Sequence, residues 1–277
     1  INVRSNYSYQ IMPCLHMSRE FHIYFRWGSC PGSENYNQIF SKYVVLSGYL
    51  FDYLFDKNGH RETGSNVMIP ITVFDTTTSE SYLRLFYKEL LDLLNIHPKL
   101  RLVIKSKKYV KSDLIDLYPR LGRYKDSRIL FVNKNESPYV AARDSLITVS
   151  LGVNSAGIEA ALYGKRSIYW SHNGLICNQL TSSNSLKLVY YDLDDMIKDL
   201  NSYILDQNKS NNLGDHSSII DQIDRFRDGM AGKRTGIFIK NFILSSEIAS
   251  DKTDILDKCM LEYENNWGIG TVTKLMN

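Results

Sequence analysis

Short apolar segments alternate with amphipathic ones between residues 66 and 203, and this alternation constrains the fold more than any other feature of the sequence. Most of the apolar segments have the length of strands, and residues with apolar side chains at helical spacing follow them. Strands separated by helices in this way predict βαβ units and a parallel sheet. The predicted strands are 67–74, 100–104, 129–132, 146–150, 166–170 and 188–191, and the predicted helices are 79–94, 111–121, 139–144, 156–163 and 196–205. The sequence therefore predicts an α/β fold with a Rossmann-like, doubly wound parallel sheet.

The segments on either side of this pattern suggest further parts. Residues 1–64 are rich in aromatic side chains and turn formers, with one predicted strand at 43–46, and the polar segment 56–65 predicts a linker. We expect a partial N-terminal domain and linker at 1–64, a Rossmann-like domain at 65–205 and a helical C-terminal tail at 206–277. The tail should hold helices near 219–226, 233–244 and 255–267. Because the sequence opens at Ile1 in what resembles a domain interior, we expect it to be a fragment.

Composition and charge exclude several classes of protein. Hydrophobic residues make up 43% and charged residues 23%, which is typical of a globular chain and not of a disordered or fibrous one. The net charge of +3 gives no support for a nucleic-acid partner. Residues 105–128 are nevertheless rich in Lys and Arg. This stretch is either a surface for phosphate or an anionic membrane, or a solvated helix face.

The cysteines and the hydropathy pattern bear on location. Cys14, Cys30, Cys177 and Cys259 are widely separated, form no CxxC pair and have no clustered histidines nearby. We therefore expect no metal, no disulfide framework and a reducing, cytoplasmic environment. No apolar run approaches the length of a membrane span, and no signal-peptide pattern opens the sequence. Peripheral contact with the cytoplasmic face of the inner membrane stays open as an alternative.

The segment that best predicts chemistry runs from residue 147 to residue 170. A predicted strand ends in small polar residues that open a helix, and ligands of open α/β sheets bind outside the carboxyl ends of strands. The helix N-terminus near Asn154, Ser155 and Ala156 suits a phosphate, and Gly157 would permit close approach of the backbone. Glu159, expected in the first turn, could accept hydrogen bonds from two ribose hydroxyls. The alternative is that Ser155 and Glu159 only cap the helix and favour its dipole.

The same run, from Ser155 to Lys165, resembles the donor-site signature of GT-B glycosyltransferases, with Arg166 where proline is usual. Further stretches are similar to enzymes of bacterial capsule and lipopolysaccharide synthesis related to Kdo transferases, chiefly to their C-terminal half. These stretches are residues 44–48 with Asp52, residues 72–75, 82–94 and 102–105, the segment 226–234 and the ending 263–268.

The resemblance implies positions for a nucleotide-sugar donor. The nucleotide would lie over Asn154 to Glu159, with Glu159 on the ribose and the loop from Asn133 to Ser137 near the base. Lys105 would face a phosphate or a carboxylate, and the alternative is an ordinary surface lysine. A helix N-terminus with Lys105 could stabilise the leaving phosphate, so no metal or other cofactor is expected. Kdo- and sialic-acid-transferring GT-B enzymes often have His-Pro after a strand. Here His97-Pro98 precedes a strand, which favours a structural role and leaves a CMP-linked donor in question.

The activity implied is transfer of a sugar from a CMP-, CDP- or UDP-linked donor to a glycan or lipid-linked acceptor. The catalytic base cannot be assigned, because such enzymes usually supply it from the N-terminal half, so this fragment alone could be inactive. Two alternatives stay open: a UDP-N-acetylglucosamine 2-epimerase-like enzyme, and a non-catalytic nucleotide-sugar-binding module of polysaccharide assembly. The aromatic residues Tyr24, Phe25 and Trp27 would line an acceptor cleft or belong to a core.

Overall fold

The computed structural model describes most of the chain, which divides into two compact units. The described residues are 3–5, 21–28, 41–55, 68–75, 79–107, 109, 111–123, 128–172, 180, 187–210, 212–248 and 252–275. One unit combines Ile1–Asp56 with Ile220–Asn277, and the other is Lys57–Ile219. The predicted linker at 56–65 and the cysteines Cys14, Cys30 and Cys177 lie outside the described residues.

The unit of residues 57–219 is built on a parallel sheet, as the alternation of segments predicts. Its strands are β4 (Ile69–Phe74), β5 (Leu100–Lys105), β6 (Ile129–Phe131), β7 (Ile147–Leu151), β8 (Ser167–Trp170) and β9 (Val189–Tyr190). They lie in the order β6-β5-β4-β7-β8-β9, with neighbours parallel. The chain thus moves from β4 to one edge and then returns to β7 on the other side of β4. This is a Rossmann order whose switch point lies between β4 and β7.

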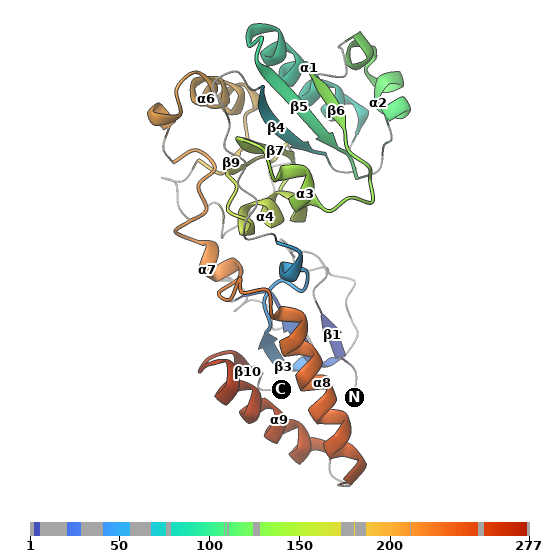
Figure 1. Ribbon diagram of the computed structural model, residues 1–277, viewed down its shortest axis with the longest axis vertical. Helices are drawn as coiled ribbons and strands as arrows, with labels where there is room; N and C mark the ends of the chain where they lie inside the picture. The colour runs from blue at the N-terminus through green and yellow to red at the C-terminus, as the bar shows by residue number, and fades with distance from the viewer. Residues whose placement is uncertain are drawn as a thin grey trace. The chain divides into compact units, whose positions relative to one another are not determined.

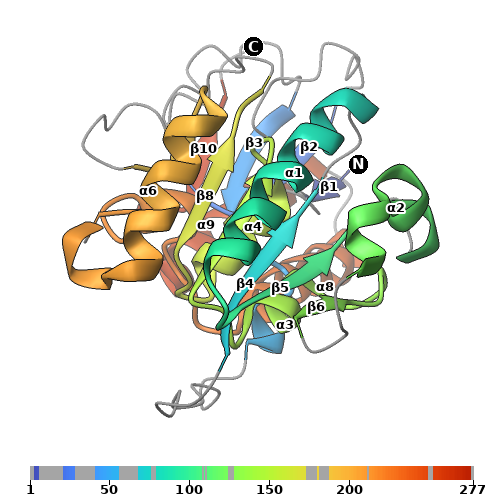
Figure 2. The same cartoon turned by 90° about the horizontal axis from the view of Figure 1, so that it is seen from above.

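Helices cover both faces of this sheet, which confirms the doubly wound prediction. The helices are α1 (Glu80–Ile96), α2 (Lys111–Leu117), α3 (Pro138–Ala142), α4 (Ser155–Leu162) and α6 (Leu193–Leu205). Helices α1 and α6 pack together on one face, whereas α3 and α4 pack on the opposite face (Figure 1, Figure 2). The core on the α3 and α4 face uses small side chains, Ala142 and Ala160, against Phe74. Small side chains let these two helices approach the strands closely.

Helix α1 shows how the sequence produces one of these elements. Its apolar side chains recur every three or four residues, and those of Leu83, Phe86 and Leu90 are buried against the sheet. The helix ends at His97, whose ring nitrogen Nε2 lies 2.6 Å from Oδ1 of Asn201 in α6. His97 therefore has the structural role predicted for it.

Several side chains of the basic stretch 105–128 have internal partners. The guanidinium of Arg128 donates to the carbonyl of His97 at 2.8 Å and so satisfies the end of α1. Arg120 forms an ion pair with Asp92 at 2.8 Å, and the Lys111 ammonium lies over the ring of Phe131. These contacts favour the structural explanation of the stretch at these three positions. Lys108 and Lys125 lie outside the described residues.

The second unit is a smaller α/β assembly made from both ends of the chain. Its strands are β1 (Val3–Ser5), β2 (Phe21–Arg26), β3 (Ser41–Leu46) and β10 (Val272–Lys274), in the order β1-β2-β3-β10. Strands β1, β2 and β3 are parallel, and β10 is antiparallel to β3. Its helices are α7 (Ile220–Ile223), α8 (Ala231–Ile248) and α9 (Lys252–Trp267), with the 3-10 helix η2 at Asp52–Leu54. Tyr24, Phe25 and Trp27 are buried, so they belong to a core.

This second unit differs from the expected division of the chain. The residues from Ile220 onward belong to the same unit as residues 1–56 and do not form a separate helical tail. The reason is packing: Leu256, Met260 and Tyr263 of α9 share one core with Ile23 and Val45 of the sheet. Strand β10 then completes the sheet by pairing with β3.

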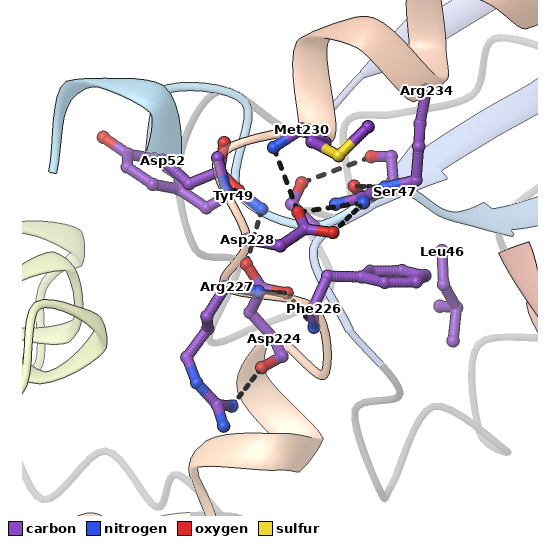
Figure 3. A network of polar contacts seen from close by, with 12 residues as sticks. Leu46, Ser47, Tyr49, Asp52, Asp224, Phe226, Arg227, Asp228, Met230 and Arg234 are labelled. Atoms are coloured by element: carbon purple, nitrogen blue, oxygen red, sulfur yellow. Dashed lines mark hydrogen bonds and ion pairs between the residues drawn. The ribbon is translucent and has the colours of Figure 1, made fainter. Parts of the chain in front are cut away.

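A buried polar network holds the second unit together (Figure 3). Arg234 is fully buried, and its Nη1 donates to both carboxylate oxygens of Asp228, at 2.8 and 2.9 Å. Its Nε donates to the carbonyl of Ser47 at 2.9 Å, and its guanidinium lies 3.8 Å from the ring centre of Phe226. Asp52 accepts the amide of Gly229 at 2.9 Å. The two stretches that resemble polysaccharide enzymes, 44–52 and 226–234, therefore bind each other.

Asp224 explains why α7 stops at Ile223 and does not continue to residue 226. Its carboxylate accepts the amide of Phe226 at 2.8 Å and the amide of Tyr49 at 2.8 Å. The first of these bonds turns the chain away from the helical path, and Arg227 then adopts a positive φ of 44°. The side chain of Asp224 thus replaces the continuation of the helix with a link to the segment that follows β3.

Candidate functional site

The carboxyl edge of the six-stranded sheet gathers the residues predicted to bind a donor. Lys105 ends β5, the loop 133–137 follows β6, and α4 follows β7. These three strands lie on both sides of the switch point, and parallel strands present their carboxyl ends at a common edge. The contacts described below join Lys105 to this loop, and Glu159 of α4 to the start of α3, which follows the loop.

Helix α4 begins with a cap made by Asn154. The Asn154 side-chain oxygen accepts the amide of Gly157 at 3.0 Å, and its Nδ2 donates to the carbonyl of Gly152 at 3.2 Å. The cap is therefore Asn154 and not Ser155, which is the first residue of the helix. Amides of a first helical turn have no partner within the helix, so Ser155 and Ala156 present the donors that an anion would use.

Gly157 has a clear packing role. A Cβ added there would lie 2.5 Å from Cε1 of Tyr169 and 2.7 Å from Oγ of Ser150. The missing side chain therefore lets α4 lie directly against β7 and β8. Tyr169 is in turn held in place by His216, because the Tyr169 hydroxyl lies 3.3 Å from Nε2 of this buried histidine. The close approach that Gly157 permits is thus the approach of a helix to its sheet.

Glu159 is buried in the second turn of α4, which corrects its expected place in the first turn. The helix starts at Ser155, so Glu159 is its fifth residue. The side chain is 7% exposed, and its Oε1 accepts the amide of Tyr139 at 3.3 Å. Tyr139 belongs to α3, and its ring packs edge-on against Tyr163 after α4. Glu159 therefore does not cap its own helix, and its carboxylate faces the start of α3.

Lys105 is a buried cation at the same edge. It is 9% exposed, and its ammonium donates to the carbonyl of Lys134 at 3.1 Å. Burial lowers the pKa of Lys105, while the nearby carboxylates of Glu159, Asp75 and Glu136 act in the opposite direction. A lysine with little exposure next to several carboxylates is not an ordinary surface lysine. The structural alternative considered for it is therefore disfavoured.

The loop between β6 and α3 carries two more predicted residues. Asn133 is exposed, and its Oδ1 accepts the amide of Asn135 at 2.9 Å, which shapes the turn. Ser137 stands at the N-cap position of α3 without making a side-chain cap. Its hydroxyl is buried and has no hydrogen-bond partner among the described residues. Buried hydroxyls are normally paired, so an acceptor or donor is missing at this point.

Asp75 is a buried acid of this edge that the sequence reasoning did not select. It directly follows β4, and its carboxylate accepts the hydroxyl of Tyr87 at 2.9 Å and the amide of Lys107 at 3.1 Å. Burial raises the pKa of Asp75, although these two hydrogen bonds act to lower it. Its position was the available signal, because it is a polar residue at the carboxyl end of the central strand. Its contact with Lys107 links the carboxyl ends of β4 and β5, and its contact with Tyr87 links β4 to α1.

Two other features bear on the chemistry of the molecule. Within the described parts of the chain, no three His, Cys, Asp or Glu side chains gather as a metal site would require. No helix of those parts is both long and apolar enough to cross a membrane. The polar groups brought together at the edge are thus a lysine, carboxylates, a hydroxyl and backbone amides.

Comparison with known proteins identifies the fold. No protein-family model matches the chain, and no curated protein matches it in sequence. Among solved structures, the S. aureus MnaA–UDP co-structure has a TM-score of 0.55 at 15% identity and covers 80% of this chain and 61% of that one. A protein assigned as a UDP-N-acetylglucosamine 2-epimerase from Listeria monocytogenes has a TM-score of 0.53 at 13% identity and covers 84% and 61%.

A third structure, the C-terminal domain of a group 1 glycosyl transferase (LpcC) from Francisella tularensis, has a TM-score of 0.43 at 13% identity, with coverage of 56% and 86%. The first two likenesses, with the Rossmann order of the sheet, assign the chain a GT-B-type fold. The chain spans about three fifths of the length of each of these two structures.

Proposed function

We propose that this chain binds the nucleotide of a sugar-nucleotide donor at the carboxyl edge of the six-stranded sheet, as the donor half of a GT-B glycosyltransferase. One observation supports this proposal above the others. Lys105, the loop 133–137 and Glu159 come from three separate segments. Lys105 donates to the loop at Lys134, Glu159 accepts the amide of Tyr139 just after the loop, and the charge of Glu159 acts on the pKa of Lys105. A buried lysine with carboxylates near it, at the carboxyl edge of a parallel sheet, is the kind of polar cluster that is often retained for a ligand.

Each group then has a chemical task. The α4 N-terminus and Lys105 would bind the phosphates, because both are positive and cost no reorganisation during reaction. Glu159 would accept hydrogen bonds from the ribose hydroxyls, and Ser137, with the loop from Asn133, would face the base. During transfer the bond from the anomeric carbon to the phosphate oxygen breaks and a bond to the acceptor oxygen forms. A base outside this cluster would take the acceptor proton.

For the donor nucleotide and the acceptor, we propose chemical classes and not single compounds. UDP is the first nucleotide to test, because UDP is bound in the MnaA structure. CMP and CDP stay in the panel because the sequence leaves the nucleotide of the donor open. The acceptor would be a glycan or lipid-linked glycan of a bacterial surface polysaccharide, met at the cytoplasmic face of the inner membrane. Because the chain spans three fifths of the matched structures, catalysis is proposed only for the whole enzyme.

A 2-epimerase is the second candidate, since the likeness in fold to the Listeria protein favours it. Both enzymes would bind a nucleotide sugar at the same edge, so binding does not separate them. Product analysis does: an epimerase converts UDP-N-acetylglucosamine without an acceptor, whereas a transferase releases the nucleotide only when the sugar is transferred. In the full-length enzyme, nucleotide binding with neither product would indicate a non-catalytic module.

The test of donor binding is calorimetric titration of the chain with UDP, CDP, CMP and GDP. We expect one nucleotide to bind saturably, and Glu159→Gln to weaken it by about 1–3 kcal/mol, the scale for leaving buried polar groups unpaired. Asp116→Asn, an exposed carboxylate on α2, is the matched control and should bind as the wild type does. If no nucleotide binds, or both variants bind equally, donor binding at Glu159 is excluded.

A further inference from the structure

A second group of side chains lies at the carboxyl edge, on the face covered by α1. Tyr82 is in the first turn of α1, which follows β4, and His172 stands two residues after the end of β8. Their ring centres are 4.5 Å apart. Both rings also contact Trp170, the last residue of β8, at centre distances of 6.0 and 5.7 Å. None of these residues takes part in the proposed nucleotide contacts.

The three rings form an aromatic platform that is angled and not flat, because their planes are inclined to one another by 52° to 73°, and its base is rigid. Trp170 is buried and stacks nearly parallel to Phe86, with an angle of 13° between the rings. Tyr82 is 40% exposed and His172 is half-buried, so the platform lies at the surface and not in the core. Burial lowers the pKa of His172, so its ring is neutral at physiological pH. A neutral imidazole and a phenol offer an apolar face with polar edges.

The platform also contains an unsatisfied donor. The indole Nε1 of Trp170 is buried, and it has no hydrogen-bond partner among the described residues. Buried Trp N–H groups usually have an acceptor, and leaving one unpaired is unfavourable. A pyranose matches this combination, because its C–H faces pack on aromatic rings and its hydroxyls accept hydrogen bonds.

We propose that Tyr82, His172 and Trp170 form a subsite for the pyranose ring of the donor sugar. This inference rests on the proposed function, since a sugar nucleotide held at the same edge would bring its sugar there. Tyr82 would pack against one face of the sugar ring, the inclined ring of His172 would contact its edge, and the indole of Trp170 would donate to a hydroxyl. The subsite therefore discriminates the sugar, whereas the cluster around Lys105 and Glu159 binds the nucleotide.

The test compares each free nucleotide with its sugar nucleotides, by titration of the full chain. The probes are UDP, UDP-glucose, UDP-galactose and UDP-N-acetylglucosamine, or the corresponding set for another nucleotide that binds. We expect at least one sugar nucleotide to bind more tightly than the free nucleotide. Tyr82→Ala should remove this gain, with a loss of about three- to tenfold in affinity for the sugar nucleotide and none for the nucleotide. Tyr82→Phe should keep the gain.

The matched control is Tyr191→Ala, since Tyr191 is an exposed tyrosine of the same unit, 50% exposed. It should bind both ligands as the wild type does. A spectroscopic reading is independent of affinity: Trp170 is the tryptophan of residues 57–219, and Trp27 and Trp267 belong to the other unit. The sugar nucleotide should change the fluorescence more than the nucleotide does, and Trp170→Phe should abolish the difference.

The outcomes separate this inference from the proposed function. If a nucleotide binds and its sugar nucleotides show no gain, or if Tyr82→Ala weakens nucleotide and sugar nucleotide equally, the subsite is disproved and nucleotide binding stands. If no nucleotide or sugar nucleotide binds, the proposed function fails and the subsite fails with it.

Discussion

At the scale of single residues, side chains at the edge of the sheet divide into those that build the edge and those whose polar groups the fold does not fully use. Asn154 and Gly157 build it, the first by capping α4 and the second by letting α4 lie against Tyr169. Lys105 and Ser137 are less fully accounted for by the fold, since Lys105 is a buried cation and the Ser137 hydroxyl is unpaired among the described residues. A ligand that binds here should affect the second pair first.

Gly157→Ala is expected to lower the free energy of unfolding by roughly 1–3 kcal/mol, the range for overpacked sites, because the new methyl group overlaps Tyr169 and Ser150. Nucleotide affinity should fall as well, since α4 must shift. Urea unfolding and titration measure the two effects. Gly236→Ala is the control: it has nothing within 4 Å of the added Cβ and lies inside α8, so it should be neutral or stabilising. Equal stability of the two variants would contradict the packing role of Gly157.

At the scale of elements, the strands and helices of residues 68–205 could be predicted because their information is local. Each strand is a short apolar run, and α1 shows its buried face in sequence spacing alone. Strands β1, β2 and β10 were not predicted. Strand β10 is short and largely exposed, and its pairing with β3 joins segments that are far apart in the sequence. The length of α7 was wrong for a similar reason, since Asp224 bonds to Tyr49 far away in the sequence.

The candidate site was also predicted only as far as its information is local in the sequence. Glu159, Lys105 and the loop 133–137 could be named from strand ends and from the resemblance, whereas their mutual contacts could not. Asp75 was missed because its contacts with Tyr87 and Lys107 depend on how β4, α1 and β5 meet.

The buried His216, whose ring lies next to the hydroxyl of Tyr169, predicts that the stability of the unit of residues 57–219 depends on pH. Burial lowers the pKa of His216 to about 4, below its ordinary 6.5. The unfolded chain therefore takes up a proton that the folded chain does not, and stability present above pH 6.5 is lost as the pH falls towards 4. The loss should reach roughly 3 kcal/mol for this group.

Two experiments between pH 7 and pH 4 measure this loss. Urea unfolding gives the free energy of unfolding, and hydrogen exchange gives the protection of β7 and β8. His216→Gln should flatten the pH dependence of the exchange protection of these strands. His22 is an exposed histidine of the other unit, and His22→Gln should leave this pH dependence unchanged. A pH dependence that is identical in wild type and His216→Gln would show that His216 is not buried in its neutral form.

At the scale of the whole molecule, the chain forms one unit from its middle and one from both of its ends. The chain passes between the units near residues 56 and 220, and both positions are close in sequence to the network of Arg234, Asp52 and Asp224. Within its own unit, this network binds the segment that leaves β3 to the segment that returns before α8. The stretches 44–52 and 226–234 thus have a structural role in this unit.

The central claim is that a nucleotide binds at the carboxyl edge of the six-stranded sheet. Hydrogen exchange with mass spectrometry, on the full chain with and without saturating UDP, tests it most directly. The account predicts slower exchange in three separate peptides, which contain residues 105–107, 133–139 and 152–159, and no change in α8 and α9. Protection confined to α8 and α9, or absent at all three edge segments under saturation, would contradict the claim.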